Sequence, residues 1–394
     1  MKDKIAIFFW GEISIHACNL AKQLHKEGFE IALFLYTPKY AYKNIYSRTL
    51  LSELKSSKIN VIELKCTKLE EQFIKLNRIT IFLKIPWLNL LTNIFLPKKT
   101  TNFFKSDNYK YIISVTHFSL FWLYKTEAAS LKKTLYYSLE IHQTTDPGTR
   151  KNSWHYAIIN KEAKLLSFVK ALIIQDKLRA QELLKNTSGK NDIDVIYLPV
   201  SIHGETIKNK SNYLYEMFNL QKEKKIILYF GAEYKERKLE ELIESFSQVK
   251  NPELILVIHG AGELKQIDKP VNVRVSNVLV EYDRIHEIIS SATIGIALYD
   301  ISWPNTRLTA FSSEKIARYL QTGVPFIAFK NESYDNLKNE FNCCELIEDM
   351  NELENALITM MNDYETYRNN CFLAYNKYYN ISNSIKPLIN YLHS

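Results

Sequence analysis

The chain alternates short apolar runs with segments of helical period, and after one interruption it does so again. In the first half the apolar runs lie at 5–10, 31–36, 60–64, 111–115, 134–139, 171–175 and 195–199. Helical patterns such as 14–27 and 156–168 lie between these runs. Strands that alternate with helices are typical of βαβ units, because parallel neighbours need a long crossover connection. Residues 1–200 are therefore predicted to form a doubly wound Rossmann-like domain.

A polar stretch, S-I-H-G-E-T-I-K-N-K-S-N at 201–212, interrupts the alternation, which then restarts. The later apolar runs lie at 226–230, 254–258, 273–275, 294–298 and 325–329, and helical patterns at about 238–249, 283–291, 313–322 and 351–361. A chain of 394 residues exceeds the roughly 250 at which single cores usually split. We expect a second Rossmann-like domain at 213–362, facing the first across a cleft. The helical patterns within 363–394 leave no strand to pair, and we expect them to pack back on the N-terminal domain.

Charge and cysteine usage restrict the class of partner. The 51 Lys and Arg exceed the 43 Asp and Glu and are spread along the chain, which favours an anionic ligand or a membrane surface. The chain has no nucleic-acid-binding motif, so nucleic acid is not an expected partner. The five cysteines lack the paired C-x-x-C spacing of a zinc site and favour a reducing cytoplasm. The opening M-K-D-K-I-A-I-F-F-W-G-E reads as a first strand rather than a signal peptide.

Glycines are scarce, so those that follow strands are informative. Only 10 occur, about 2.5% of the chain against a usual ~7%. Gly11, Gly231, Gly260 and Gly262 all follow predicted strands. They form neither a G-x-G-x-x-G dinucleotide fingerprint nor a G-x-x-x-x-G-K-[ST] phosphate loop. A nicotinamide-dependent oxidoreductase and a P-loop kinase are both disfavoured.

The stretch F-G-A-E-Y-K-E-R-K at 230–238 is a strand end followed by a charged turn. An amphipathic helix follows, with an apolar stripe at Leu239, Leu242, Ile243 and Phe246. Arg237 precedes this helix, where a guanidinium could donate two parallel hydrogen bonds to a diphosphate. The alternative is a solvated cluster in which neighbouring glutamates pair with it.

The stretch S-S-E-K-I-A-R-Y-L-Q-T-G-V-P-F-I-A-F at 312–329 predicts a helix, a glycine stop and a buried strand. Ser312 or Ser313 can cap the helix. Glu314 and Arg318 are four residues apart on one face, with Lys315 beside them. They form either a surface ion pair or one wall of the cleft.

These two stretches and L-I-L-V-I-H-G-A-G-E between them resemble the donor-binding half of the family 4 glycosyltransferases, enzymes of the GT-B fold. The resemblance covers most of the chain. It implies transfer of a sugar from a nucleotide-sugar co-substrate with retention of configuration, as in a hexosyltransferase, and with no metal or other cofactor. It assigns the donor diphosphate to Arg237, which we also expect to act in catalysis. The donor-binding residues that it implies are Gly231, Arg237, Gly260, Gly262, Ser312, Ser313, Glu314, Lys315 and Arg318.

In the N-terminal half, T-L-Y-Y-S-L-E-I-H and A-L-I-I-Q-D-K-L-R-A-Q-E-L-L look like bacterial members that make surface glycans. By this resemblance Glu140 and His142 are candidate catalytic residues. Gly11, Glu12 and His117 lie at the ends of other predicted strands and are candidates for binding the acceptor. A purely structural role for either histidine remains the alternative.

The chain departs from the family pattern at its best-known motif. Two glutamates eight positions apart are expected, and this chain has Ala310 and Arg318 instead. Many relatives also have an arginine at the position of Ala232. Glu314 could supply a carboxylate in place of the missing pair. A catalytically silent GT-B partner subunit that binds a glycosylated or lipid ligand is therefore the alternative function. The one D-I-D, Asp192 to Asp194, is interpreted as a polar turn rather than a metal site.

The apolar stretch 79–99 is broken by Lys84, Pro86 and Asn89 and ends in P-K-K. It is a poor transmembrane helix but suits a segment at a membrane interface. An ordinary buried helix is the alternative. The interfacial interpretation predicts a cytoplasmic protein in peripheral contact with the inner face of the plasma membrane, acting on a glycan or lipid-linked acceptor.

Overall fold

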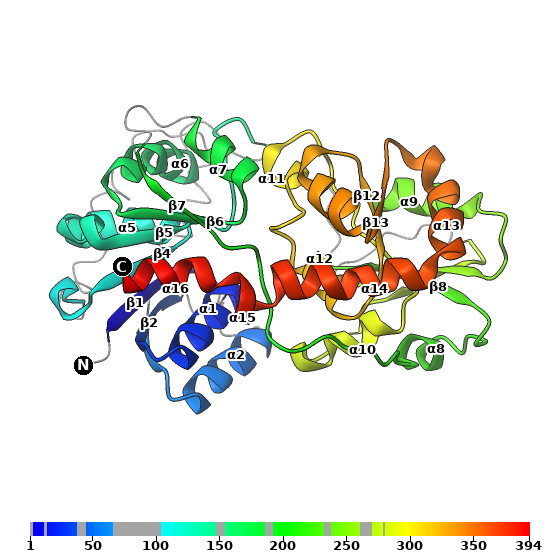
Figure 1. Cartoon of the computed structure of the whole chain (residues 1–394), viewed down its shortest axis with the longest axis horizontal. Coiled ribbons are helices and arrows are strands. Elements are labelled where there is room, and N and C mark those ends of the chain that lie inside the picture. The colour runs from blue at the N-terminus through cyan, green and yellow to red at the C-terminus, as the bar shows by residue number, and fades with distance from the viewer. Residues whose placement is uncertain are drawn as a thin grey trace. The chain divides into compact units, whose positions relative to one another are not determined.

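The computed structural model describes residues 3–11, 14–37, 45–65, 104–146, 154–185, 192–231, 238–260, 270–278 and 280–394. Contacts divide the chain into two compact units, which are described separately (Figure 1). Unit 1 comprises Met1–Leu198 and Ile385–Ser394, and unit 2 comprises Pro199–Ser384.

Unit 1 contains a parallel sheet of seven strands in the order β3-β2-β1-β4-β5-β6-β7. The strands are β1 (Lys4–Trp10), β2 (Glu30–Thr37), β3 (Asn60–Lys65), β4 (Tyr111–Val115), β5 (Thr134–Tyr137), β6 (Ala171–Ile174) and β7 (Asp194–Tyr197). The helices are α1 (Ile15–Lys26), α2 (Ile45–Ser56), α5 (His117–Glu127), α6 (Trp154–Leu165), α7 (Lys177–Leu184) and α16 (Lys386–His393). Each strand expected in the first half is confirmed.

Helices lie on both sides of this sheet, with α1 and α2 on one side and α5, α6 and α7 on the other (Figure 1). Every residue of β4, β5 and β6 is buried. A parallel sheet that is covered on both faces has no side exposed to solvent. Its strands are therefore apolar along their whole length instead of alternating apolar and polar residues. The strand order reverses direction between β1 and β4, and open sheets of this type bind ligands at the carboxyl ends beside such a reversal.

Unit 2 contains a parallel sheet of six strands in the order β10-β9-β8-β11-β12-β13. The strands are β8 (Lys225–Phe230), β9 (Leu254–His259), β10 (Val273–Ser276), β11 (Ile294–Ile296), β12 (Phe326–Phe329) and β13 (Cys344–Ile347). The helices are α8 (Tyr213–Met217), α9 (Leu239–Ser247), α10 (Ile285–Ser290), α11 (Pro304–Arg307), α12 (Glu314–Gln321), α13 (Leu353–Asn362), α14 (Tyr364–Ala374) and α15 (Ile381–Ser384). The direction reverses between β8 and β11.

Side chains of β8 alternate between two cores on opposite faces of the sheet. Ile226 and Leu228 pack in a cluster with residues of α10 and α12, and Ile227 and Tyr229 in a cluster with residues of α9 and α13. The predicted stripe of α9 is buried in the second of these cores, as expected. Strand β13 was not predicted, because C-E-L-I is short and carries a glutamate.

The segment 363–394 is divided between the units. Helices α14 and α15 belong to unit 2, and α16 belongs to unit 1. In unit 1 the Tyr391 hydroxyl donates to Asp194 Oδ2 at 3.0 Å, and the His393 ring stacks on Phe29. Asp194 of the D-I-D sequence is therefore a partner of the C-terminal helix.

The helices that the structure describes include none with both the length and the apolarity needed to span a bilayer. The stretch 79–99 lies outside the described residues, so the predicted interfacial segment stays a prediction.

Candidate functional site

Two glycines bring the ends of β8 and β9 into direct backbone contact in unit 2. Gly231 has φ +138°, a conformation that favours glycine, and its N–H donates to His259 O at 3.0 Å. A Cβ on Gly260 would lie 1.8 Å from Gly231 O, so a side chain cannot fit there. The carboxyl ends of β8 and β9 are therefore packed backbone against backbone, next to the point where the strand order reverses between β8 and β11.

Lys315 places a positive charge at this strand end. It lies in the first turn of α12, and its Nζ is 3.9 Å from the centre of the Tyr229 ring and 5.4 Å from that of Tyr299. A Cβ built on Gly231 would meet Lys315 Nζ at 3.6 Å. Cations are attracted to the faces of aromatic rings, so the two tyrosines hold the ammonium beside Gly231.

The serines before α12 support this arrangement in a way that the sequence did not suggest. Ser313 occupies the N-cap position but makes no capping bond with its side chain. Its hydroxyl instead forms a hydrogen bond with the hydroxyl of Tyr299, at 2.7 Å. Ser312 Oγ donates to Leu308 O at 3.1 Å. Sequence reasoning missed Tyr229, the penultimate residue of β8, and Tyr299, which follows β11.

Glu314 and Arg318 form the expected ion pair, but it is neither at the surface nor directed outward. Arg318 Nε lies 2.8 Å from Glu314 Oε1, and only 9% of the Arg318 side chain is exposed. The Tyr282 hydroxyl donates to the same oxygen at 2.9 Å, and the guanidinium lies 4.4 Å from the Tyr282 ring centre. Burial, together with the Glu314 carboxylate, raises the pKa of Tyr282. The Arg318 guanidinium is therefore engaged in contacts within unit 2. Ala310, the other position at which the expected motif has a glutamate, is fully buried.

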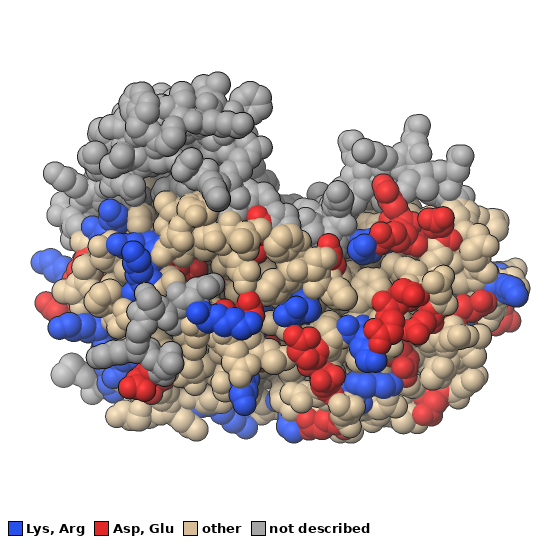
Figure 2. All heavy atoms as spheres, turned by 90° about the horizontal axis from the view of Figure 1, so that it is seen from above, with Lys and Arg blue, Asp and Glu red and all other residues tan. Residues whose placement is uncertain are grey.

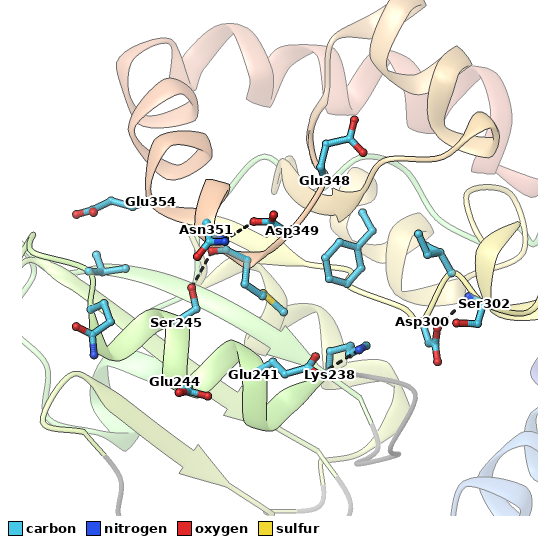
Figure 3. A pocket seen from close by; sticks show the side chains of 15 residues that line it. Lys238, Glu241, Glu244, Ser245, Asp300, Ser302, Glu348, Asp349, Asn351 and Glu354 are labelled. Atoms are coloured by element: carbon cyan, nitrogen blue, oxygen red, sulfur yellow. Dashed lines mark hydrogen bonds and ion pairs between the residues drawn. The ribbon is translucent and has the colours of Figure 1, made fainter.

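A pocket elsewhere in unit 2 is lined mainly by acidic and other polar side chains. A pocket of about 890 Å³ lies between α9 and the segments after β11 and β13 (Figure 3). The carboxylates that line it are those of Glu241, Glu244, Asp300, Glu348, Asp349 and Glu354. Lys238 also lines it and pairs with Glu241 at 3.0 Å. Figure 2 shows Asp and Glu side chains gathered on unit 2, at the right of that view. Such a lining repels a diphosphate, so the edge beside Lys315 is the better anion site.

In unit 1 the end of β1 repeats the glycine turn. Gly11 follows β1 with φ +130°, and its N–H donates to Tyr36 O at the end of β2, at 3.0 Å. Thr116, directly after β4, has φ +75°, which is unusual for a β-branched residue. This turn starts α5 at His117.

Three imidazoles meet at this edge of unit 1. His117 begins α5, His142 follows β5, and His155 lies in the first turn of α6. Their ring centres are 4.8 Å apart for His117 and His142, 5.3 Å for His117 and His155, and 5.1 Å for His142 and His155. Burial lowers the pKa of His117 and of His142, and burial together with His142 lowers that of His155 to about 4. All three rings are uncharged at neutral pH.

The structure brings together two predicted histidines and one that sequence reasoning missed. His155 precedes the helix expected at 156–168, and its chain distance from His117 gave no sign of contact. Glu140 lies in the segment after β5 and is exposed.

A buried arginine fixes the segment that carries Glu140 and His142. Arg179 in α7 is fully buried and donates to Gln175 Oε1 at 2.7 Å and to Leu139 O at 3.0 Å. Gln175 Nε2 in turn donates to Ser138 O at 2.7 Å. The Q-D-K-L-R sequence noted above therefore positions the segment after β5.

Three predicted site residues, Glu12, Arg237 and Gly262, lie outside the described residues. Their assignments stay predictions. Among the residues that the structure describes, those of the predicted donor site that lie together are Gly231, Gly260, Ser313 and Lys315, and Tyr229 and Tyr299 lie beside them.

Comparison with known proteins identifies the fold. No family model matches the sequence, and no curated protein matches it. Among solved structures, HepE of Anabaena in complex with UDP-glucose is 12% identical, with 99% of each chain covered and a TM-score of 0.68. Sucrose-phosphate synthase of Thermosynechococcus elongatus is 13% identical, with 100% of this chain and 99% of that chain covered and a TM-score of 0.67. A glycosyltransferase of Rickettsia africae is 12% identical, with 99% and 98% covered and a TM-score of 0.65.

The likeness extends over nearly the whole of each chain, and at these identities it is a likeness of fold. The resemblance to GT-B glycosyltransferases is confirmed at that level, with two Rossmann-like units built on parallel sheets of seven and six strands.

Proposed function

We propose that the protein is a glycosyltransferase that transfers a hexosyl group from a nucleotide-sugar with retention of configuration. The acceptor we propose is a glycan or lipid-linked sugar of a bacterial surface glycan. The observation that carries the proposal is the Lys315 ammonium, which lies beside Gly231 at the reversal point of the unit 2 sheet. HepE, which shares the fold, was solved with UDP-glucose, so that is the first donor to test.

The chemistry of transfer suits this group of residues. Cleavage of the donor's glycosidic bond leaves a nucleoside diphosphate, and negative charge develops on it in the transition state. A cation already positioned there lowers the barrier, because no reorganisation is needed at the moment of reaction. Lys315 and Arg237 supply this charge in our proposal, and Gly231, which has no side chain, lets the diphosphate approach the backbone beside Lys315. No metal is required at the diphosphate.

In unit 1 we assign acceptor and sugar contacts to the edge that carries Gly11, Glu12, His117, Glu140 and His142. A neutral imidazole has one N–H donor and one nitrogen acceptor, so these uncharged histidines can form hydrogen bonds with sugar hydroxyls. The Arg179 bonds to the segment after β5 hold Glu140 and His142 at the strand end. We further propose that the protein acts in the cytoplasm, in peripheral contact with the plasma membrane through residues 79–99.

A specific observation favours the alternative, a silent GT-B partner that binds but does not transfer. The position of the second family glutamate is occupied by Arg318, which is bonded to Glu314 and covered by Tyr282. Neither Arg318 nor buried Ala310 supplies a carboxylate to a donor ribose.

A nucleotide-sugar panel separates the two functions. The full chain is incubated with UDP-, GDP- and TDP-sugars, with and without membrane lipid extract as acceptor, and the released nucleoside diphosphate is measured by chromatography. The proposal expects release from one nucleotide class and loss of that release in Lys315→Met and in Arg237→Ala. Binding of a nucleoside diphosphate without any release would support the silent partner. Neither binding nor release would overturn both.

A further inference from the structure

The histidine cluster of unit 1 has the composition of a transition-metal site. His117, His142 and His155 each offer one ring nitrogen, and these three atoms all lie within 4.8 Å of one another. Imidazole is a preferred ligand of Zn²⁺, Cu²⁺ and Ni²⁺. We propose that these three histidines bind one divalent transition-metal ion of the zinc class.

The nitrogen separations are compatible with a site that tightens around the ion. Zinc binds histidine nitrogen at about 2.0–2.1 Å in tetrahedral geometry, which places two such nitrogens about 3.3 Å apart. The rings therefore need to approach one another by at most about 1.5 Å. His142 and His155 are only partly buried, so their rings can rotate towards the buried His117. The same partial exposure provides an entry path for the ion.

Unpaired nitrogens point to a missing ligand. His117 is 5% exposed, and its Nε2 is buried without a hydrogen-bond partner among the described residues. Nε2 of His155 is buried without such a partner as well. A buried polar atom without a partner is costly, by about 1–3 kcal/mol. A metal ion bound by these lone pairs would remove that cost.

The surroundings supply a partner for orientation. Asp146 Oδ2 lies 3.9 Å from His142 Nδ1 and accepts the backbone N–H of Gln143 at 2.7 Å. At 3.9 Å the two atoms make no hydrogen bond, but a ring movement of about 1 Å would let His142 Nδ1–H donate to Asp146, which fixes the tautomer and leaves the other nitrogen for the metal. Asp146 is therefore a positioning residue, and its negative charge offsets part of the charge of the ion.

The number of ligands indicates what the ion could contact. Structural zinc sites are usually closed by four protein ligands, whereas three leave a fourth position for water or an oxygen of a small ligand. The metal site proposed here belongs to unit 1, whereas the lysine that we assign to the donor diphosphate belongs to unit 2. It does not depend on the proposed transferase function, and the test below needs no sugar donor.

The first measurement is titration of the chelator-stripped full chain with ZnCl₂ by calorimetry, together with thermal unfolding. We expect one ion per chain and a rise of the unfolding temperature with zinc concentration. His142→Gln and His155→Gln should each weaken binding by more than about 100-fold, and Asp146→Asn by about 10–100-fold. His286→Gln is the matched control, because this ring lies in unit 2, where its Nδ1 is 2.6 Å from Asp283 O, and it does not belong to the cluster.

A second measurement avoids substitutions that could impair folding. Diethyl pyrocarbonate modification of the unaltered chain, read by peptide mass spectrometry, should be slowed by Zn²⁺ at His142 and His155 and unchanged at His286. Absence of zinc binding, or binding that neither protects His142 and His155 nor responds to their substitution, would overturn the proposal.

Discussion

The two units begin with the same strand-end turn and then diverge in chemistry. Gly11 after β1 and Gly231 after β8 have φ values of +130° and +138°. Each N–H donates at 3.0 Å to a carbonyl near the end of the adjacent strand, Tyr36 O in β2 and His259 O in β9. In unit 2 the next strand also ends in a glycine, Gly260, and a lysine stands beside the pair. In unit 1 three uncharged imidazoles and a strained Thr116 occupy the corresponding edge.

Strand topology therefore determines where a site can form, whereas the residues at that edge determine its charge. The reversal of strand order produces a crevice in each sheet. The edge of unit 2 carries the Lys315 ammonium, buried against two tyrosines, which suits an anionic donor group. The edge of unit 1 carries three uncharged imidazoles with carboxylates beside them, which suits hydroxyl groups or a metal ion.

The largest expected effect separates the glycine contact of unit 2 from the simple turn of unit 1. In Gly260→Ala the new Cβ would lie 1.8 Å from Gly231 O, a backbone atom that cannot rotate away. We expect a loss of more than about 3 kcal/mol in the free energy of unfolding, measured by urea denaturation.

Gly11→Ala is the matched control in unit 1. Its Cβ would meet nothing closer than Phe9 Cε1 at 3.9 Å, so only the cost of positive φ remains, about 1 kcal/mol. Equal losses in the two variants would show that the strand ends of unit 2 do not touch as described.

The next effect concerns the buried ion pair of unit 2. Arg318→Glu places a second carboxylate beside Glu314 in a site where the arginine side chain is 9% exposed. We expect destabilisation of about 2–3 kcal/mol, below the usual cost of breaking a fully buried pair because Glu314 is partly exposed. The exposed pair of Arg284 and Glu287 supplies the control, and Arg284→Glu should change stability little. An Arg318→Glu variant as stable as the parent would contradict the internal role of this arginine.

A buried carboxyl without a cation in unit 1 provides the contrasting case. Glu162 accepts from the Tyr136 hydroxyl, and burial raises its pKa from 4.5 to about 7. Between these two pH values the folded protein keeps a proton that the unfolded chain releases, so stability falls as pH rises through this range. Glu162→Gln should remove this decline, so its free energy of unfolding relative to the parent should be about 3 kcal/mol higher at pH 7.5 than at pH 4.5.

Urea denaturation of both proteins across pH 4.5–7.5 measures this difference. A constant offset between parent and Glu162→Gln would mean that the carboxyl titrates alike in the folded and unfolded chains.

Sequence periodicity was sufficient for the strands, since apolar runs buried on both faces leave a clear pattern. It failed at β13, where a half-polar run of four residues was too short to distinguish from a loop. The proximity of Gly231, Gly260 and Lys315 was anticipated from the sequence, and their donor role stays a prediction. Two other contacts were not anticipated, those of Tyr282 with Arg318 and of His155 with His117, because each joins segments far apart in the chain.

The charge of Arg318 also shows why spacing alone is insufficient. Four-residue spacing correctly predicted its pairing with Glu314, but the helix face that carries the pair is covered by Tyr282. Burial is set by packing between elements, which no local pattern records.

Calorimetric titration with UDP tests the central claim most directly, because it asks whether the Lys315 edge binds a nucleoside diphosphate. The full chain should bind UDP, and Lys315→Met should weaken binding by about 10–100-fold, the worth of one hydrogen bond to a charged group. Lys330→Met, which removes an exposed lysine paired with Glu348, should leave the affinity unchanged. No binding by the parent, or equal affinity in Lys315→Met, would contradict the account.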